Sequence, residues 1–372
     1  GVDDGDRVGR DRPVARERPG DVGVRLDDSR DRRAGDAAAR GRGARAAATC
    51  SVSVPTSDGG AGLTTISRAE RVRGALRGQF LGDALALGSH WIYNLRERRR
   101  RFPDGIAGFE PPADDHYHRG RVPGDGTHYA DAAEALLASV VERGGLDPRD
   151  YGARLVATYG AADYRGFLDK PTRILLERER EWRRARPEEP YPFDDGADDE
   201  QTVSLCRLAP VVVAHARDDD LAARVAAAVR VCQNNDRAVA HALVYAELLR
   251  RLLAGEGLME AVEAAVAVTP EPFAGEIRDR LGDARDMADL PAIHATGEVG
   301  RSCYLPNTFP SMLHVLVRHG DEPPTALLET VRAGGDNASR AAVVGAWLGA
   351  AHGERAWPAD WPALAEAGNA HP

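Results

Sequence analysis

The segment with the clearest chemical content is Gly334-Gly335-Asp336-Asn337-Ala338-Ser339, which opens an apolar stretch ending at Gly353. A glycine pair lets the backbone adopt conformations closed to other residues. Asp336 and Ser339 stand three positions apart, so a helix starting here would bring two hard oxygen donors to one face, within reach of Mg²⁺ or Mn²⁺. The same spacing is typical of a helix N-cap, so a cap and a ligand both remain open.

Two earlier stretches carry further candidates. Asp83 interrupts the apolar run "GQFLGDALALG", and a carboxylate on such a face must be paired, hydrogen-bonded or metal-bound unless it faces solvent. His90 and Trp91 follow, where an imidazole could carry a proton and an indole could stack, although such a pair is often simply partly buried. Asp131 opens the helix of "GTHYADAAEALLASV", a position that the helix dipole also favours for a structural aspartate.

Three polar stretches could bind substrate. The loop "DDGADDEQ" brings acidic residues to a helix start, where they could share a cation, bind ribose hydroxyls or simply be solvated. The stretches "CQNNDRAVAHA" and "GRSCYLPNTFPSMLH" contain polar side chains that a helix alone would not require, although asparagine pairs are also common in turns. The candidates in these stretches are Asp198, Asp199, Glu200, Asn234, Asn235, Tyr304 and Asn307.

The composition argues against several classes of protein. The net charge of −9 argues against a nucleic-acid binder that works by neutralising phosphates. The longest apolar runs fall far below the roughly 20 residues that a membrane-spanning helix needs, and the first residues of the chain do not show the basic and then apolar pattern typical of a signal peptide. The four cysteines are widely spaced without a CxxC pattern, so neither a disulfide framework nor a zinc site is indicated. We expect a soluble, cytoplasmic protein.

The elements that must position these residues are predicted to be helices. Residues 1–66 contain few large apolar side chains and are predicted to be disordered. A capping box of Ser67 and Glu70 starts the first helix, and β-branched alternation typical of strands is absent. We therefore expect one all-α domain over 67–355 and a C-terminal tail over 356–372. Further amphipathic helices are predicted at 128–143, 149–160, 171–186, 201–216, 219–233, 237–254, 257–267, 273–283, 308–319, 323–333 and 337–352, with long loops at 102–126, 187–200 and 284–307.

The last predicted helix has one face of unusually small residues. Ala341, Gly345 and Gly349 recur at four-residue spacing, which allows a neighbouring backbone to approach closely. A helix held in this way near the centre of a bundle would present its N-terminus, with Asp336, to any cavity above it.

The order of these pieces resembles the ADP-ribosylglycohydrolase superfamily, of the dinitrogenase-reductase-activating glycohydrolase type, over residues 67–353. The resemblance rests on "GQFLGDALALG", "GRSCYLPNTFPSML" and above all "RAGGDNASRAAVVGAWLGA", which is similar to that family's terminal Gly-Gly-Asp-x-Asp-Thr helix. "HWIYN", "GADDEQ" and "SCYLPNTFP" are similar to its divergent J1-crystallin-like branch. The resemblance implies a single, mainly orthogonal all-α bundle whose cleft holds two Mg²⁺ or Mn²⁺ ions, where water attacks the anomeric carbon of an ADP-ribosyl group.

The metal motifs of the family are incomplete in this chain. Asp336 matches the first aspartate of the terminal motif and Ser339 stands where threonine is usual, but Ala338 occupies the position of the second aspartate. The family's Thr-Asp-Asp appears only as "THYAD", which leaves Asp131 as its sole carboxylate. The resemblance therefore implies a reduced metal site of Asp336, Ser339 and Asp131.

Other groups could compensate for the missing ligands. The glutamate expected shortly after the opening Gly-Asp is absent, and His90 lies in that neighbourhood, where it could act as a metal-independent base. The acidic residues 198–200 could supply the missing carboxylates.

These residues predict a hydrolase of the glycosidic bond between ADP-ribose, or a related nucleoside-type group, and an acceptor, assisted by Mg or Mn. The expected partner is an ADP-ribosylated small molecule or protein, without nucleic acid or membrane. The alternative is a catalytically impaired, crystallin-like member that keeps the fold as a ligand-binding or structural protein. The predicted catalytic residues are Asp83, Asp131, Asp199 and His90, and Gly334 and Gly335 join Asp198, Asn234, Asn235, Tyr304 and Asn307 in substrate binding.

Overall fold

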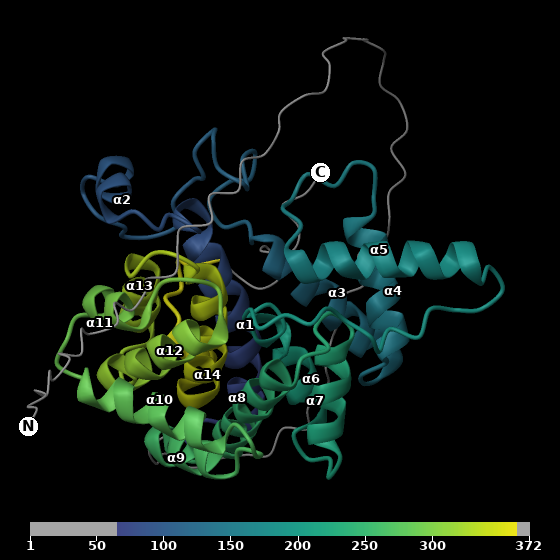
Figure 1. Ribbon diagram of the computed structural model, residues 1–372. Coiled ribbons are helices and arrows are strands. Elements are labelled where there is room, and N and C mark those ends of the chain that lie inside the picture. Colours follow the sequence, from purple (N-terminus) through teal and green to yellow (C-terminus); the bar gives the residue numbers. More distant parts are fainter. Residues whose placement is uncertain (1–64, 363–372) are drawn as a thin grey trace, which may run out of the picture. The chain divides into compact units, whose positions relative to one another are not determined.

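The computed structural model describes residues 65–362, which form α-helices joined by loops and short 3₁₀ turns (Figure 1). Within this range strand pairing is limited to isolated bridges, so the predicted all-α fold is confirmed. No helix of the described range is long and apolar enough to cross a membrane. The predicted disorder of 1–66 falls outside the described residues except for the last two. The helices are α1 (Arg68–Ala86), α2 (Leu95–Arg101), α3 (His128–Arg143), α4 (Pro148–Tyr159), α5 (Lys170–Ala185), α6 (Ala209–His215), α7 (Leu221–Arg230), α8 (Asp236–Ala254), α9 (Leu258–Ala267), α10 (Ala274–Asp286), α11 (Ala292–Val299), α12 (Leu305–His319), α13 (Pro323–Arg332) and α14 (Asn337–His352).

Most predicted helices are present, with three differences. The capping box of Ser67 and Glu70 starts α1 as expected. Of the predicted helix 201–216 only α6 is α-helical, because the backbone N–H of Thr202 bonds across to Cys303 O at 2.9 Å and Pro210 then opens the helix. The short helices α2 and α11 were not predicted, and α11 interrupts the expected loop 284–307.

Helices α1 and α14 lie side by side at the centre, between α3–α5 and α9–α13 (Figure 1). Three glycines of α1 oppose the small face of α14, and a Cβ on any of them would overlap the opposing backbone. The predicted close approach of a neighbouring backbone is therefore confirmed. The residues in contact are Gly74 with Gly349, Gly78 with Gly345, and Gly82 with Ala341.

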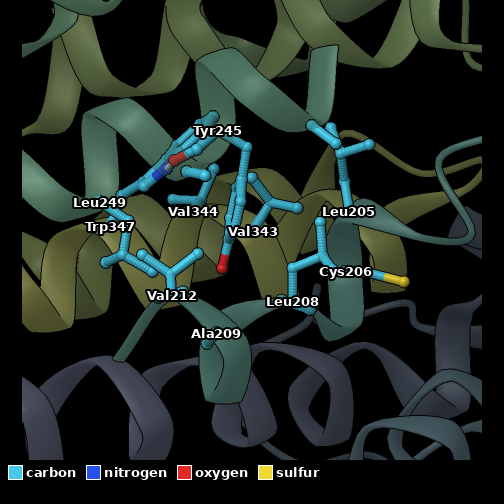
Figure 2. Close-up of a cluster of buried hydrophobic side chains, with 14 of the residues drawn as sticks. Leu205, Cys206, Leu208, Ala209, Val212, Tyr245, Leu249, Val343, Val344 and Trp347 are labelled. Carbon is cyan, nitrogen blue, oxygen red and sulfur yellow. Dashed lines mark hydrogen bonds between the residues drawn. The ribbon is translucent and has the colours of Figure 1, made fainter. Parts of the chain in front are cut away.

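The core packs against the opposite face of α14. The Trp347 ring lies tilted against Tyr245 of α8 at a centroid distance of 5.5 Å, and its Nε1–H donates to Tyr245 O at 3.2 Å (Figure 2). Val343 and Val344 of the same helix join this cluster. Because α14 contacts other helices all round, its N-terminus is fixed in place.

The chain continues to pack beyond the predicted domain end at residue 355. Trp357 is buried, and its Nε1–H donates to Gly74 O at 3.1 Å. Trp361 stacks above it at a centroid distance of 6.4 Å. The first residues of the predicted tail thus cover α1.

Candidate functional site

The turn before α14 positions Asp336. Gly334 and Gly335 have φ of +75° and +69°, the left-handed region that favours glycine. Gly335 also lies so close to Arg301 that a Cβ would overlap its backbone. Trp91 N–H donates to Gly335 O at 2.9 Å. Both glycines predicted at the site are thus needed by the turn, which brings the segment after α1 to the start of α14.

Asp336 is fully buried and does not cap its helix. Its Oδ2 accepts the Ser339 hydroxyl at 2.8 Å, and no backbone N–H bonds to its side chain. Its Oδ1 has no hydrogen-bond partner within residues 65–362 and lies 3.7 Å from His90 Nδ1. Of the two alternatives left open by the sequence, the cap is wrong. Burial raises the pKa of Asp336 to about 6, against the opposing effects of the Ser339 bond and the Arg340 charge, so the group is a carboxylate at pH 7.

His90 faces this carboxylate through its Nδ1. The Asn337 amide nitrogen donates to Ser89 Oγ at 2.8 Å and to Val331 O at 3.0 Å. Its oxygen therefore faces His90 Nδ1, at 3.3 Å, as an acceptor. The Ala338 backbone N–H also points at Nδ1, at 3.4 Å, so Nδ1 has one acceptor and one donor beside it, while Nε2 has no partner in the described part of the chain. Burial, reinforced by His116, holds the pKa of His90 well below its usual range, so the ring is a neutral base at pH 7.

A cluster of aromatic and histidine rings surrounds His90. Trp91 stacks on it at a centroid distance of 4.3 Å, while Phe167 packs edge-on to Trp91 at 4.5 Å. His118 and His128 stack at 5.3 Å. These two imidazoles were not predicted from the sequence, where only the carboxylates of this region were candidates. The signal was present, since His128 directly follows Thr127 where the family motif has its aspartates.

Asp83 and Asp131 are held apart from Asp336 by other partners. Asp83 accepts the Thr127 hydroxyl at 2.6 Å and the Thr127 backbone N–H at 2.5 Å. Asp131 forms an ion pair with Arg121 at 2.5 Å and accepts the Tyr164 hydroxyl at 2.7 Å. Neither arrangement includes Asp336, so Asp83 and Asp131 make their contacts separately from it.

The acidic loop at 198–200 and the asparagine pair at 234–235 are connected by hydrogen bonds. Asp199 is buried and pairs with Lys170 at 3.1 Å. Asp198 accepts from Asn235 Nδ2 at 2.7 Å, and Asn235 Oδ1 also caps α8. Asn234 precedes this cap in the same bridge-forming segment. These side chains fix two loops together, which explains their polarity without a ligand.

Tyr304 and Asn307 differ in whether their side chains are free to contact a ligand. Asn307 Oδ1 accepts the Ser302 hydroxyl at 2.6 Å, and its Nδ2 donates to Val299 O. This asparagine shapes its own loop. Tyr304, immediately before α12, keeps a ring that is 46% exposed, so it is free to contact a ligand.

The donors present do not fit a Mg²⁺ or Mn²⁺ centre. Of the predicted set, Asp336 and Ser339 are together, but Asp131 is neutralised by Arg121. Ala338 adds no oxygen. Within residues 65–362 no group of three or more histidine, cysteine, aspartate or glutamate side chains is placed to hold a metal ion, whereas such a cation takes about six oxygen ligands. The side chains at this site therefore do not make a metal centre.

The pKa of Asp83 predicts a pH dependence of stability. Burial raises this pKa from 3.8 to about 7, against the opposing bonds from Thr127. Because the folded-state pKa lies above the unfolded value, the stabilising contribution is complete below pH 3.8 and is lost as pH rises through about 7. The free energy of unfolding should fall by up to roughly 1.4 kcal/mol per pH unit in this window. Asp83→Asn should remove that slope in denaturant titrations, and equal slopes in both proteins would contradict the assignment.

Comparisons with known proteins agree with the resemblance seen in the sequence. A model of the ADP-ribosylglycohydrolase family matches residues 64–369. The chain is 27% identical over 313 residues to Crystallin J1A of Tripedalia cystophora, across 81% of this chain and 93% of the crystallin. It is 26% identical over 304 residues to Crystallin J1B of the same organism, across 78% and 91%. A solved chain from an "ADP-ribosylglycohydrolase-related protein complex" superposes with a TM-score of 0.58 at 27% identity, across 79% of this chain and 92% of that one.

Proposed function

Because the chain belongs to the ADP-ribosylglycohydrolase family, we propose that it hydrolyses the glycosidic bond between ADP-ribose, or a related nucleoside-type group, and an acceptor. One observation carries the proposal: a neutral histidine, His90, whose Nδ1 faces a buried carboxylate and whose Nε2 is unpartnered in the described range. A base that faces a carboxylate in this way can activate water without a metal.

In the proposed reaction His90 Nε2 takes a proton from water as the water oxygen bonds to the anomeric carbon. The bond from that carbon to the acceptor breaks, and its electron pair leaves with the acceptor, which receives the proton from the imidazolium. Asp336 stabilises the imidazolium, because its ionised Oδ1 lies 3.7 Å from His90 Nδ1. The proposed reaction requires the tautomer with its proton on Nδ1, the atom that faces the Asn337 oxygen at 3.3 Å.

A pocket beside His90 supports a nucleoside-type substrate. Its volume is about 250 Å³, and Trp91, Tyr93 and Tyr117 line it together with His90. Tyr93 and Tyr117 keep 47% and 58% of their surface exposed, and aromatic faces of this kind stack on planar bases and sugars. We place the ribose end toward His90, with Tyr304 as a further contact.

The test is release of ADP-ribose from ADP-ribosylated peptides and from small ADP-ribose conjugates, measured with excess chelator and with added Mg²⁺ or Mn²⁺. We expect release that persists in chelator, because the proposed base and its carboxylate are both protein groups. Release that requires added metal would contradict a metal-independent base and return Asp336 and Ser339 to the role of ligands.

A second candidate is binding without hydrolysis. Its support is the similarity to two crystallins, together with Ala338 at the position of a family aspartate. Calorimetry with ADP-ribose separates the candidates. Saturable binding of ADP-ribose by a protein that releases none from any conjugate would favour this second function.

A further inference from the structure

Three arginines from different parts of the chain meet at the turn before α14. Arg98 of α2 lies against Gly334, where a Cβ would come within 3.7 Å of the arginine Nη1. Arg301 Nε donates to Ala333 O at 3.0 Å. Arg340 of α14 is fully buried and donates from Nη2 to Gly334 O. Three guanidinium groups thus surround one short stretch of backbone.

No carboxylate within residues 65–362 forms an ion pair with these arginines, and several of their guanidinium N–H groups have no hydrogen-bond acceptor there. Arg98 Nη1 and the Nε and Nη1 of Arg340 are buried without a hydrogen-bond partner in that range. Glu329, whose charge reaches Arg98, is already paired with Arg332 at 2.9 Å. Burial lowers the pKa of Arg98, and the charge of Arg301 lowers it further. Like charges gathered in this way repel one another unless an anion is present.

Arg98 lines a pocket on the protein surface. Its volume is about 290 Å³, and its walls combine positive charge with apolar surface. Such walls reduce the dielectric screening of an anion held between them. Its lining residues include Arg98, Arg99, Arg332, Phe102, Ile293 and Glu329.

We propose that this pocket, here called the Arg98 pocket, binds a phosphoryl oxyanion, with Arg98 as its main contact and Arg301 and Arg340 as the positive charge behind it. Guanidinium groups recognise phosphate oxygens through paired N–H donors. The site uses neither His90 nor Asp336, so it is independent of the proposed hydrolysis. Its ligand is free phosphate or pyrophosphate, or the phosphoryl group of a nucleotide.

The experiment is a thermal-shift and calorimetric titration of the full chain with pyrophosphate, at ionic strength matched with chloride. ADP-ribose and adenosine form two further arms, because only ADP-ribose carries phosphoryl groups. We expect pyrophosphate to raise the Tm of the wild type above the chloride control. Arg98→Gln should weaken pyrophosphate binding tenfold or more. If ADP-ribose binding weakens in parallel, the nucleotide is the source of the anion, and if only pyrophosphate binding weakens, the free anion is.

The matched control is Arg96→Gln, which removes the same charge from the exposed side of the same helix. Arg98 donates no side-chain hydrogen bond to the described protein that would explain a structural role. In anion-free buffer, Arg98→Gln should therefore have a Tm equal to or above that of the wild type. The proposal is overturned if the wild type responds to pyrophosphate as it does to chloride, if Arg98→Gln and Arg96→Gln bind it equally, or if Arg98→Gln lowers the Tm without anion.

Discussion

Asp336→Asn is expected to leave the protein folded and to reduce the release of ADP-ribose by roughly 10²-fold or more, the range lost when general-base catalysis is removed. The asparagine oxygen can still accept the Ser339 hydroxyl, now 2.8 Å from Oδ2, so the change in Tm should be small. A neutral amide cannot balance the positive charge that His90 acquires when it takes a proton. Single-turnover release assays and melting curves on the same preparations measure both quantities.

Asp147→Asn is the matched control for this variant. Asp147 is a true N-cap, whose Oδ1 accepts from Arg149 N at 3.0 Å and from Asp150 N at 3.1 Å. Asparagine caps a helix as well as aspartate, so release should not change. An Asp336→Asn protein as active as this control would show that the carboxylate plays no part in catalysis.

The same carboxylate predicts the acid limb of the pH profile. Burial raises the pKa of Asp336 to about 6, and only the ionised form can stabilise the imidazolium of His90. Release of ADP-ribose by the wild type should therefore fall as the pH drops through about 6. Circular dichroism must show that the protein is folded both above and below this pH. A profile that is flat between pH 5 and 7 would contradict this role.

The helical architecture was accessible from the sequence because its signals are local. The capping box at Ser67 predicted the start of α1, and the prediction for α3 coincides with its observed bounds. Helices α2 and α11 span only 7 and 8 residues, too short to show a clear period. The segment 201–208 was misassigned because Thr202 bonds to the distant Cys303 and the residues after it form only a short 3₁₀ turn at Leu205–Arg207.

The candidate site was accessible only in part, because its geometry is tertiary. The Gly-Gly-Asp segment identified Asp336 and Ser339, and their contact was predictable from helical spacing. That Asp336 faces His90 instead of capping its helix could not be predicted, because His90 is remote in sequence. The ion pair of Asp131 could not be predicted for the same reason, since its partner Arg121 comes from a loop with no periodic pattern.

The small face of α14 shows how strongly the site depends on packing. Gly345→Ala would place a Cβ within 2.6 Å of the Gly78 carbonyl carbon, and closer still to its oxygen. Both obstacles are backbone, so no side chain can rotate away. Overpacking of a well-packed core typically costs about 1–3 kcal/mol, and we expect a loss of unfolding free energy at the upper end of this range or beyond it, measured by chemical denaturation.

Gly282→Ala separates this effect from helix propensity. Gly282 lies within α10, where an added Cβ meets nothing within 4 Å, so alanine should stabilise the protein by up to about 1 kcal/mol. Equal effects of the two substitutions would show that α1 and α14 are not in close contact. Because His90 follows α1 and Asp336 precedes α14, a Gly345→Ala protein that still folds must hold these helices further apart. It should therefore lose activity in excess of its loss of stability, whereas Gly282→Ala should keep full activity.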